Sequence, residues 1–350
     1  MFIRNCWYVA AWNHELSGET LLARSILGEP IVFFRCEDGS VTALEDRCCH
    51  RAAPLSLGRK EGDHLRCGYH GLKFDSRGIC VEIPGQDKIP PQARVRAFPV
   101  MERHSWIWIW MGDPATADET LIPPAVGLDH PDWRLKAGYL HYEASCQLIC
   151  DNLLDFSHLT FVHARTFGGT NAWANQPPKI QRLDRGLRII HTMREVDAGP
   201  MLAERGQTGK VDVFNVYDFL IPAILLLRGS RPPAGTVSVE PGENDFTSFS
   251  CQAVTPETER TSHYFFSWGP RKSADVPGLL DLMWRTALAA FEEDRKMIEA
   301  QQMRVDTNPD LNRMAIGADS ALHSFRRLVD RLIAAEQQAG KPLQTPQAPG

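Results

Sequence analysis

Two short segments near the N-terminus place cysteine and histidine side chains at the spacing of metal ligands. One residue separates Cys48 from His50, and two residues separate Cys67 from His70. Turn-forming residues flank each pair, so two loops can each present one thiolate and one imidazole to the same centre. Two cysteines and two histidines suit a tetrahedral zinc site. They equally suit a [2Fe-2S] cluster in which two thiolates hold one iron and two imidazoles hold the other.

The composition of each pair favours the cluster over zinc. Zinc sites usually draw on Cys-x2-4-Cys and His-x3-5-His pairs, whereas each segment here mixes the two residue types. Imidazole in place of thiolate makes a cluster less negative and raises its reduction potential, so that it can accept electrons from a reductase and pass them on singly. We expect the other cysteines to pack as small apolar residues; these are Cys6, Cys36, Cys49, Cys80, Cys146, Cys150 and Cys251.

A second group of candidate ligands lies in an otherwise apolar stretch. We expect a helix over residues 150–163, on which Asp155 and His158 share a face because they are three residues apart. His163 follows His158 by five residues, so joint ligation requires a π-type bulge or the end of the helix.

A carboxylate ligand is available on the long helix expected near the C-terminus. The candidates are Glu292, Glu293 and Asp294, although a solvated helix face also explains three consecutive acidic residues. Two histidines and one carboxylate would form the facial triad of non-haem iron oxygenases, which leaves positions open for O2 and substrate.

Both groups of ligands resemble those of the Rieske non-haem iron oxygenases. The resemblance rests on Cys48-Cys-His-Arg-Ala-Ala-Pro-Leu-Ser-Leu-Gly58, on Cys67-Gly-Tyr-His-Gly-Leu-Lys-Phe74, on an Asp-x2-His-x4-His spacing and on a late Glu-Asp pair. It implies a [2Fe-2S] cluster and a mononuclear Fe(II). The implied cluster ligands are Cys48, His50, Cys67 and His70, and the implied iron ligands are His158, His163 and Asp294.

The resemblance also implies roles for two further residues. Asp155 matches the carboxylate that joins a cluster imidazole, here His70, to an iron imidazole, here His158, on the neighbouring chain of a head-to-tail homotrimer. Asn152 falls where the family often has a polar residue beside the iron.

The elements that must position these residues fall into two blocks. From residue 21 to residue 112, short apolar stretches alternate with turn signals, which predicts an antiparallel β domain. Within it, Trp106–Trp110 is apolar on both faces, as in a buried strand. A proline-rich passage follows and suggests a linker. We therefore place a Rieske domain in residues 1–115 and a catalytic domain in residues 116–336.

The second block predicts an α+β arrangement. Residues 180–266 show strand-like alternation, and residues 277–304 carry apolar side chains at helical spacing. The resemblance implies a helix-grip, START-like fold, with the substrate pocket between an antiparallel sheet and the long C-terminal helix. Residues 337–350 are rich in Pro, Gln and Gly, and we expect them to be disordered.

Within the family, the chain is most similar to vanillate O-demethylase oxygenases and related aryl ether monooxygenases. This resemblance covers nearly the whole chain and includes residues 1–16, Thr255–Glu259 and His263–Phe266. It implies that O2 is used to hydroxylate an aryl methyl ether to a hemiacetal, which collapses to a phenol and formaldehyde.

Several residues are candidates for contact with the aromatic substrate. Where relatives that bind carboxylated aromatics can offer Asn and His, this chain has Leu227 and Gln252. Arg228 could pair with a carboxylate, with a structural role as the alternative. The candidate apolar walls, each equally explained by core packing, are Ile221, Leu225, Trp268 and Trp284.

Composition limits the possible partners and the compartment. The formal net charge is -5 and no basic cluster is present, which argues against nucleic acid and acidic membrane surfaces. The longest apolar run, Phe219–Leu227, is about half of the ~20 residues that cross a bilayer. Residues 1–15 lack the order of a signal peptide. Because the 9 cysteines are irregularly spaced, we expect a reducing compartment, the cytoplasm.

Two other functions share part of this pattern. A ring-hydroxylating dioxygenase would use the same metals but release a cis-diol. A Rieske electron carrier would have no use for His158 and its neighbours. The chain has no Gly-x-Gly-x-x-Gly fingerprint opening a helix and no plant-type ferredoxin motif. We therefore expect electrons to come from a separate reductase, with or without a ferredoxin.

Overall fold

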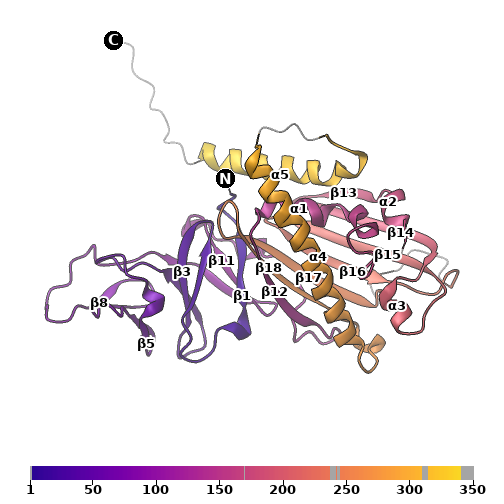
Figure 1. Ribbon diagram of the computed structural model, residues 1–350. Coiled ribbons are helices and arrows are strands. Elements are labelled where there is room, and N and C mark those ends of the chain that lie inside the picture. The colour runs from indigo at the N-terminus through magenta and orange to yellow at the C-terminus, as the bar shows by residue number, and fades with distance from the viewer. Residues whose placement is uncertain (1, 169, 237–241, 243–244, 310–313, 340–350) are drawn as a thin grey trace, which may run out of the picture.

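The N-terminal block folds into three small antiparallel sheets. The computed structural model describes residues 2–168, 170–236, 242, 245–309 and 314–339 (Figure 1). The first sheet has the order β1-β11-β10, the second β2-β3-β4-β9 and the third β5-β6-β7-β8. Their bounds are β1 Trp7–Trp12, β2 Leu22–Ile26, β3 Glu29–Arg35, β4 Val41–Glu45, β5 Arg59–Glu61, β6 His64–Arg66, β7 Lys73–Phe74, β8 Cys80–Glu82, β9 Ala97–Phe98, β10 Val100–Arg103 and β11 Trp106–Trp110. The expected antiparallel β block is confirmed.

Strand β11 is the centre of this block and is buried on both faces, as its sequence predicts. All five of its side chains are buried. Its isoleucines, Ile107 and Ile109, join the core that includes Ile31 and Phe33. Its tryptophans join a separate core that reaches into the C-terminal block.

The C-terminal block is a seven-stranded antiparallel sheet with helices on one face (Figure 1). The strand order is β12-β18-β17-β16-β15-β14-β13. The strands are β12 Lys136–Tyr142, β13 Lys179–Leu183, β14 Gly186–Asp197, β15 Lys210–Leu220, β16 Ile224–Ser230, β17 Ser248–Pro256 and β18 Ser262–Pro270. The helices are α1 Cys146–Leu154, α2 Ala172–Asn175, α3 Pro200–Glu204, α4 Leu279–Thr307 and α5 Ser320–Ala339. The α+β class is therefore confirmed.

The two faces of this sheet meet different partners because side chains alternate along each strand. One face carries Phe249 and Cys251 into the core formed with the tryptophans of β11. The other face carries Phe266, whose ring centroid lies 4.8 Å from that of Phe291 on α4. The first face joins the two blocks, and the second supports the long helix.

The expected long helix is confirmed as α4, but two expectations about the C-terminus need correction. Helix α5 was not anticipated. Residues 337–350, which we predicted to be disordered, overlap the end of this helix, because the helix continues to Ala339. Tertiary contact explains the difference: the carboxylate of Glu336 accepts hydrogen bonds from the backbone N–H groups of Arg4 and Asn5, at 2.9 and 2.8 Å. Residues 340–350 lie outside the described part of the chain.

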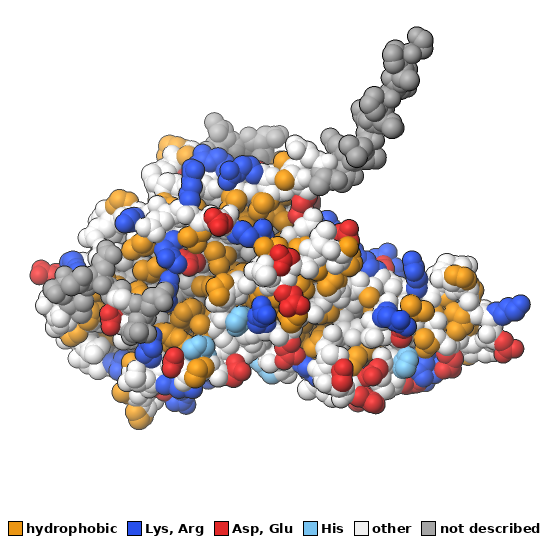
Figure 2. Space-filling model, turned by 180° about the vertical axis from the view of Figure 1, so that it is seen from behind, with side chains coloured by type: hydrophobic (Ala, Val, Ile, Leu, Met, Phe, Trp, Pro, Cys, Tyr) orange, Lys and Arg blue, Asp and Glu red, His pale blue; other side chains and the backbone are white. Residues whose placement is uncertain are grey.

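Figure 2 shows Lys, Arg, Asp and Glu side chains distributed together over one face of the molecule. Among the described residues, every helix is too short or too polar to traverse a bilayer.

The contact between the sheet and α4 generates a stability prediction at Gly138 of β12. A Cβ atom added there would lie 2.1 Å from Cζ of Phe266, which itself packs against α4. Overpacking of this kind costs about 1–3 kcal/mol. We therefore expect Gly138→Ala to lower the thermal midpoint by several degrees, measured by circular dichroism.

A matched control is Gly209→Ala. Gly209 is exposed, and nothing lies within 4 Å of a Cβ added there. The melting temperature of the Gly209→Ala protein should equal that of the parent protein. Equal destabilisation by both substitutions would show that the Gly138 contact is unimportant.

Candidate active site

The segment that carries both histidines is a short helix followed by turns, and not the single helix expected over residues 150–163. Helix α1 begins after Ser145, whose side chain accepts a hydrogen bond from the Leu148 N–H. It ends at Leu154, because Asp155 adopts an extended conformation with φ -128° and ψ 95°. A 3-10 helix, η5 (Phe156–Thr160), follows. Of the two alternatives, a π-type bulge or a helix end, the structure therefore has a helix end, and it lies at Asp155 before both histidines.

This break brings His158 and His163 against Asp294 of α4. One ligand atom from each of the three residues lies within 4.8 Å of the others. Nε2 of His163 is 3.1 Å from Oδ2 of Asp294, and Nε2 of His158 is 3.5 Å from Oδ1. His163 and Asp294 are buried, with relative exposures of 1% and 4%. Two imidazoles and a carboxylate converging in this way fit a single divalent metal ion.

Outer contacts fix the orientation of each imidazole. Nδ1 of His158 donates to the backbone carbonyl of Asp155. Nδ1 of His163 donates to Oε2 of Glu293 at 2.9 Å, and Thr166 donates its hydroxyl to the same oxygen at 2.8 Å. In each ring Nε2 is thereby left to face Asp294, as metal ligation requires.

The two imidazoles have pKa values displaced in opposite directions. Burial lowers the pKa of His158, and the nearby charge of Asp294 offsets this only in part. Burial acts in the same direction on His163, but hydrogen bonds and charge from Asp294 and Glu293 outweigh it and raise its pKa. Of the three acidic candidates, Asp294 is the one that faces both rings, while Glu292 pairs with Arg295 at 2.6 Å.

The two remaining residues expected at this centre lie beside the ligands. Nδ2 of Asn152 donates to Oδ1 of Asp294 at 3.0 Å and lies 3.4 Å from Nε2 of His158. Asp155 is half-buried, and its Oδ1 accepts a hydrogen bond from the Ser157 N–H at 2.9 Å.

The cysteine and histidine pairs converge at the far end of the N-terminal block. Cys48 and Cys67 are buried, and the rings of His50 and His70 lie 4.7 Å apart at the surface. The two loops are in close contact, since a Cβ atom on Gly68 would be 2.7 Å from the backbone oxygen of Leu57.

The chemistry of this donor set, two buried thiols and two imidazoles, fits a bound metal centre. Burial, with a further contribution from the adjacent Cys67, raises the pKa of the Cys48 thiol to about 11. A thiol in such surroundings becomes a thiolate when a cationic metal takes the proton's place.

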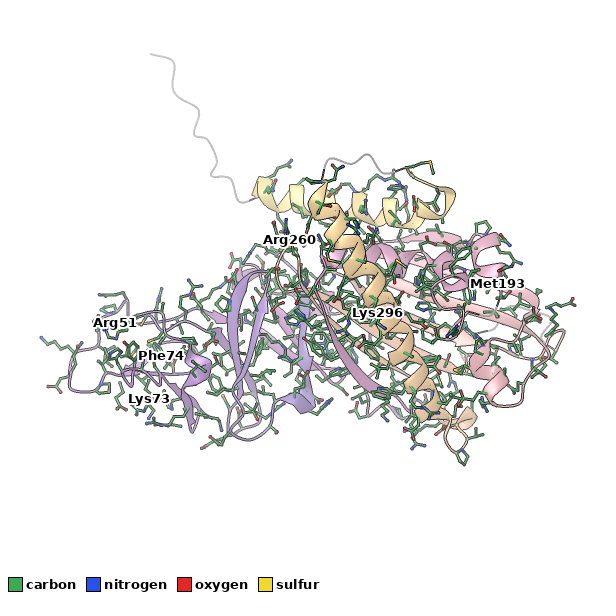
Figure 3. All side chains as sticks on the ribbon, viewed as in Figure 1. Arg51, Lys73, Phe74, Met193, Arg260 and Lys296 are labelled. Carbon is green, nitrogen blue, oxygen red and sulfur yellow. The ribbon has the colours of Figure 1, made fainter. Side chains whose placement is uncertain are left out.

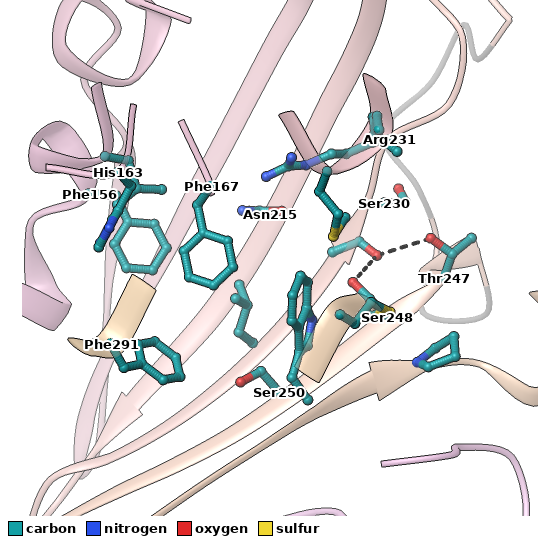
Figure 4. A pocket seen from close by; sticks show the side chains of 18 of the residues that line it. Phe156, His163, Phe167, Asn215, Ser230, Arg231, Thr247, Ser248, Ser250 and Phe291 are labelled. Carbon is teal, nitrogen blue, oxygen red and sulfur yellow. Dashed lines mark hydrogen bonds between the residues drawn. The ribbon is translucent and has the colours of Figure 1, made fainter. Parts of the chain in front are cut away.

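A cavity of about 280 Å³ opens beside the two histidines and Asp294 (Figure 4). Aromatic rings form much of its wall; they are Phe156, Phe167, Trp268 and Phe291. Side chains from three neighbouring strands, among them Asn215, Leu227, Ser248, Ser250 and Gln252, form its floor. A cavity of about 150 Å³ admits benzene, so this one has room for a substituted single ring.

Some of the expected substrate contacts line this cavity and others do not. The expected contacts that line it are Leu227, Gln252 and Trp268. Both polar ends of the Gln252 amide are engaged, because Oε1 accepts from the Tyr264 hydroxyl at 2.7 Å and Nε2 donates to Ser250 at 3.1 Å.

The other expected contacts need correction. Ile221 and Leu225 are core residues outside the described lining. Trp284 lies on the side of α4 that faces β12, where its Nε1 donates to the Ala137 carbonyl at 3.0 Å. The guanidinium of Arg228 lies 5.8 Å from the centroid of Phe246, in the core on the other face of the sheet.

Sequence reasoning missed the polar residues at the end of the cavity away from the histidines. These include Asn215 and Arg231, and Figure 4 shows both. A signal for Arg231 was present, because Leu227, Gly229 and Arg231 alternate along β16 and beyond. Arg228 is one residue out of that register and therefore points to the opposite face.

The hydrogen bond from His163 to Glu293 generates a prediction about metal affinity. We expect Glu293→Gln to weaken Fe(II) binding about 10–100-fold, because the residue that orients His163 is lost. Competition with a chelator measures the affinity, and Asp294→Ala provides the reference for a lost ligand. Glu292→Gln is the matched control, since Glu292 pairs with Arg295. The assigned orientation is wrong if both glutamine variants bind Fe(II) equally well.

Comparison with known proteins places these sites in one family. The Rieske [2Fe-2S] domain matches residues 6–99, and the vanillate O-demethylase oxygenase C-terminal domain matches residues 142–335. The iron-sulfur subunit TsaM1 of a toluene-4-sulfonate monooxygenase system from Comamonas testosteroni is 44% identical, over 98% of this chain and 100% of the relative.

O-demethylase oxygenases are also similar over nearly the full length. The oxygenase component of dicamba O-demethylase from Stenotrophomonas maltophilia is 36% identical, over 95% of this chain and 98% of the relative. The crystal structure of dicamba monooxygenase bound to dicamba superposes with a TM-score of 0.86 at 34% identity, covering 96% of this chain and 99% of that one.

These matches and the two groups of ligand residues indicate the same cofactors. The chain has a Rieske [2Fe-2S] domain and a mononuclear iron site formed by two histidines and an aspartate. It is an oxidoreductase that requires a reductase partner. The chain therefore belongs to the Rieske non-haem iron oxygenases, in the family of the vanillate and dicamba O-demethylase oxygenases and the toluenesulfonate monooxygenase subunits.

Proposed function

We propose that this oxygenase component hydroxylates a methyl carbon on a small aromatic compound, with O-demethylation of a methoxy group as the principal reaction. The observation that carries the proposal is the placement of His158, His163 and Asp294 at one end of a largely aromatic cavity sized for a single ring. The metal supplies O2 activation when it is bound and supplied with electrons.

The chain's own groups hold the methyl carbon near the metal and exclude water. Phe156, Phe167 and Phe291 form the apolar wall next to the ligands (Figure 4). One oxygen atom enters the methyl C–H bond and the other leaves as water, at the expense of two electrons and two protons. With a methoxy group, the resulting hemiacetal breaks its C–O bond to give a phenol and formaldehyde.

Hydroxylation of a ring methyl group is a second candidate. It is favoured by the 44% identity to a subunit whose name specifies toluene-4-sulfonate. The two reactions share the same C–H hydroxylation, but a ring methyl group yields a stable benzylic alcohol and no formaldehyde.

A single-turnover experiment distinguishes these products without the native reductase. The protein is chemically reduced under argon, mixed with 4-methoxybenzoate or toluene-4-sulfonate, and exposed to O2. We expect formaldehyde from the ether in proportion to mononuclear iron, and none from His158→Ala, whose cluster should keep its Rieske EPR signal. A benzylic alcohol alone would support the second candidate, and a cis-diol would overturn both.

For electron delivery, we propose a homotrimer in which Cys48, His50, Cys67 and His70 hold the cluster of one chain and serve the iron of the next. Within one chain the two centres lie in different parts of an elongated molecule: Figure 3 labels Arg51, next to His50, at one end and Lys296 on α4 in the other part. The exposed imidazole of His70 and the half-buried Asp155 support a route from His70 through Asp155 to His158 across the interface.

This route predicts that Asp155→Asn retains both metal centres but slows electron transfer. We expect oxidation of the reduced cluster, followed by its visible absorbance after addition of O2 and substrate, to slow by about 10-fold or more. Asp151→Asn is the control, since Asp151 pairs with Arg326 of α5.

Light scattering on the same samples gives the oligomeric state. A fully active monomer, or an unchanged cluster oxidation rate in Asp155→Asn, would contradict the route.

A further inference from the structure

The end of the cavity away from the iron ligands is cationic. Arg231 follows β16 directly, and Figure 4 shows its guanidinium extending toward Asn215, across the cavity from His163. Arg205, at the end of α3, also lines the cavity. Asp294, at the iron end, is the one carboxylate among the described lining residues.

The guanidinium of Arg231 has no carboxylate or carbonyl partner among the described residues, unlike other arginines of the same sheet. Arg188 pairs with Asp218 at 2.6 Å, and Arg194 pairs with Asp212 at 2.9 Å. Arg231 is half-buried. A guanidinium remains charged in a protein, and a charge that has lost part of its solvent is stabilised by a counter-ion. The cavity therefore holds a cation whose counter-ion is not part of the described chain.

The strand register places polar side chains on the cavity floor near Arg231. Asn215, Gly229, Ser248 and Pro270 are directly paired across β15, β16, β17 and β18. Asn215 is buried, and its amide makes no hydrogen bond to another described residue. A Cβ atom on Gly229 would lie 2.9 Å from Oδ1 of Asn215 and 3.0 Å from Oγ of Ser248. Glycine therefore leaves the space between these two side chains open.

The next row toward the iron presents fewer polar groups to the cavity, since Tyr217, whose hydroxyl has no partner in the described part of the chain, is not among the lining residues. It contains Tyr217, Leu227, Ser250 and Trp268. Leu227 is apolar, and Ser250 accepts from Gln252, whose carbonyl oxygen is occupied by Tyr264. Polar groups open to a ligand are thus concentrated around Arg231.

We infer that Arg231, assisted by Asn215, binds the oxyanion of a single-ring aromatic sulfonate or carboxylate and so directs the opposite end of the ring toward the iron. This inference rests on the proposed methyl hydroxylation and names its substrate class. Arg231 is then a specificity-determining residue: it anchors the ring and takes no part in the oxidation.

Binding measurements on the iron-loaded, oxidised protein test this without turnover. Two pairs of ligands of nearly equal shape are titrated calorimetrically: toluene-4-sulfonate against toluene-4-sulfonamide, and 4-methoxybenzoate against 4-methoxybenzamide. A charge-assisted contact should favour at least one anion over its neutral partner by about 10- to 100-fold. The ligand pair with the larger ratio of anion affinity to amide affinity identifies sulfonate or carboxylate as the preferred group.

Variants then assign the preference to Arg231. Arg231→Gln should bring the ratio close to one and leave the affinity for the neutral amide unchanged, while Arg231→Lys should retain part of the preference. Arg228→Gln, on the other face of the sheet, should bind like the parent protein. Iron, sulfide and visible spectra confirm that each variant is folded; should Arg231→Gln fail to fold, the parent protein and Arg231→Lys carry the test.

The parent protein binding each anion and its amide equally, or Arg231→Gln keeping the preference, would overturn the inference. Neither result would affect the methyl hydroxylation, which the single-turnover products test separately. Conversely, the protein could show an anion preference that depends on Arg231 and yet oxidise neither methyl nor methoxy groups. That result would support the anion site and refute the proposed function.

Discussion

The contact of one carboxylate with two imidazoles is the constraint on which the rest of the C-terminal block depends. Asp294 must be buried to reach His158 and His163. Its neighbours on the same face of α4, among them Phe291 and Ile298, are apolar and hold the helix against the sheet. An unpaired carboxylate there would be strongly destabilising. A metal ion shared with two imidazoles compensates that cost, so the binding of iron and the docking of α4 stabilise each other.

The two faces of the seven-stranded sheet have different roles. One face joins the two blocks, and the other borders α4 and the cavity. The face that packs on the tryptophans of β11 is filled with side chains and joins the two blocks. The other face is packed where helices cover it, through contacts such as Phe266 with Phe291 of α4 and Phe219 with Phe325 of α5. Farther along the same strands small side chains, including Gly229 and Ser248, leave a cavity. Apolar walls lie next to the iron ligands and polar groups lie at the opposite end, which orients any ring that carries one charged substituent.

The two metal sites differ in their access to solvent, and this difference suits their tasks. The histidines of the first site are exposed, so a redox partner can approach the imidazole edge of the cluster. The ligands of the second site are largely buried, which limits the access of water to the metal. Because the sites lie in different parts of the chain, electron transfer is expected to depend on contact between molecules. In the proposed homotrimer, assembly would be part of the catalytic apparatus.

The sequence by itself determined the family and the main elements, because each has a local signature. The mixed Cys/His pairs, the buried strand Trp106–Trp110 and the long C-terminal helix follow from residue types and spacing, whereas the resemblance to the family singled out His158, His163 and Asp294 as iron ligands. Only the tertiary structure decided where the first helix ends, that α5 is ordered to Ala339 by contacts such as that of Glu336 with the N-terminus, and which side chains line the cavity. The last point follows from the two-residue period of a strand, in which a shift of one position exchanges the faces. The sequence analysis named Arg228 alone as a possible anion partner, and Arg231 lies three residues farther along. The pairing of β16 with its neighbours turns Arg228 toward the face that carries Phe246 and leaves Arg231 on the side of the cavity.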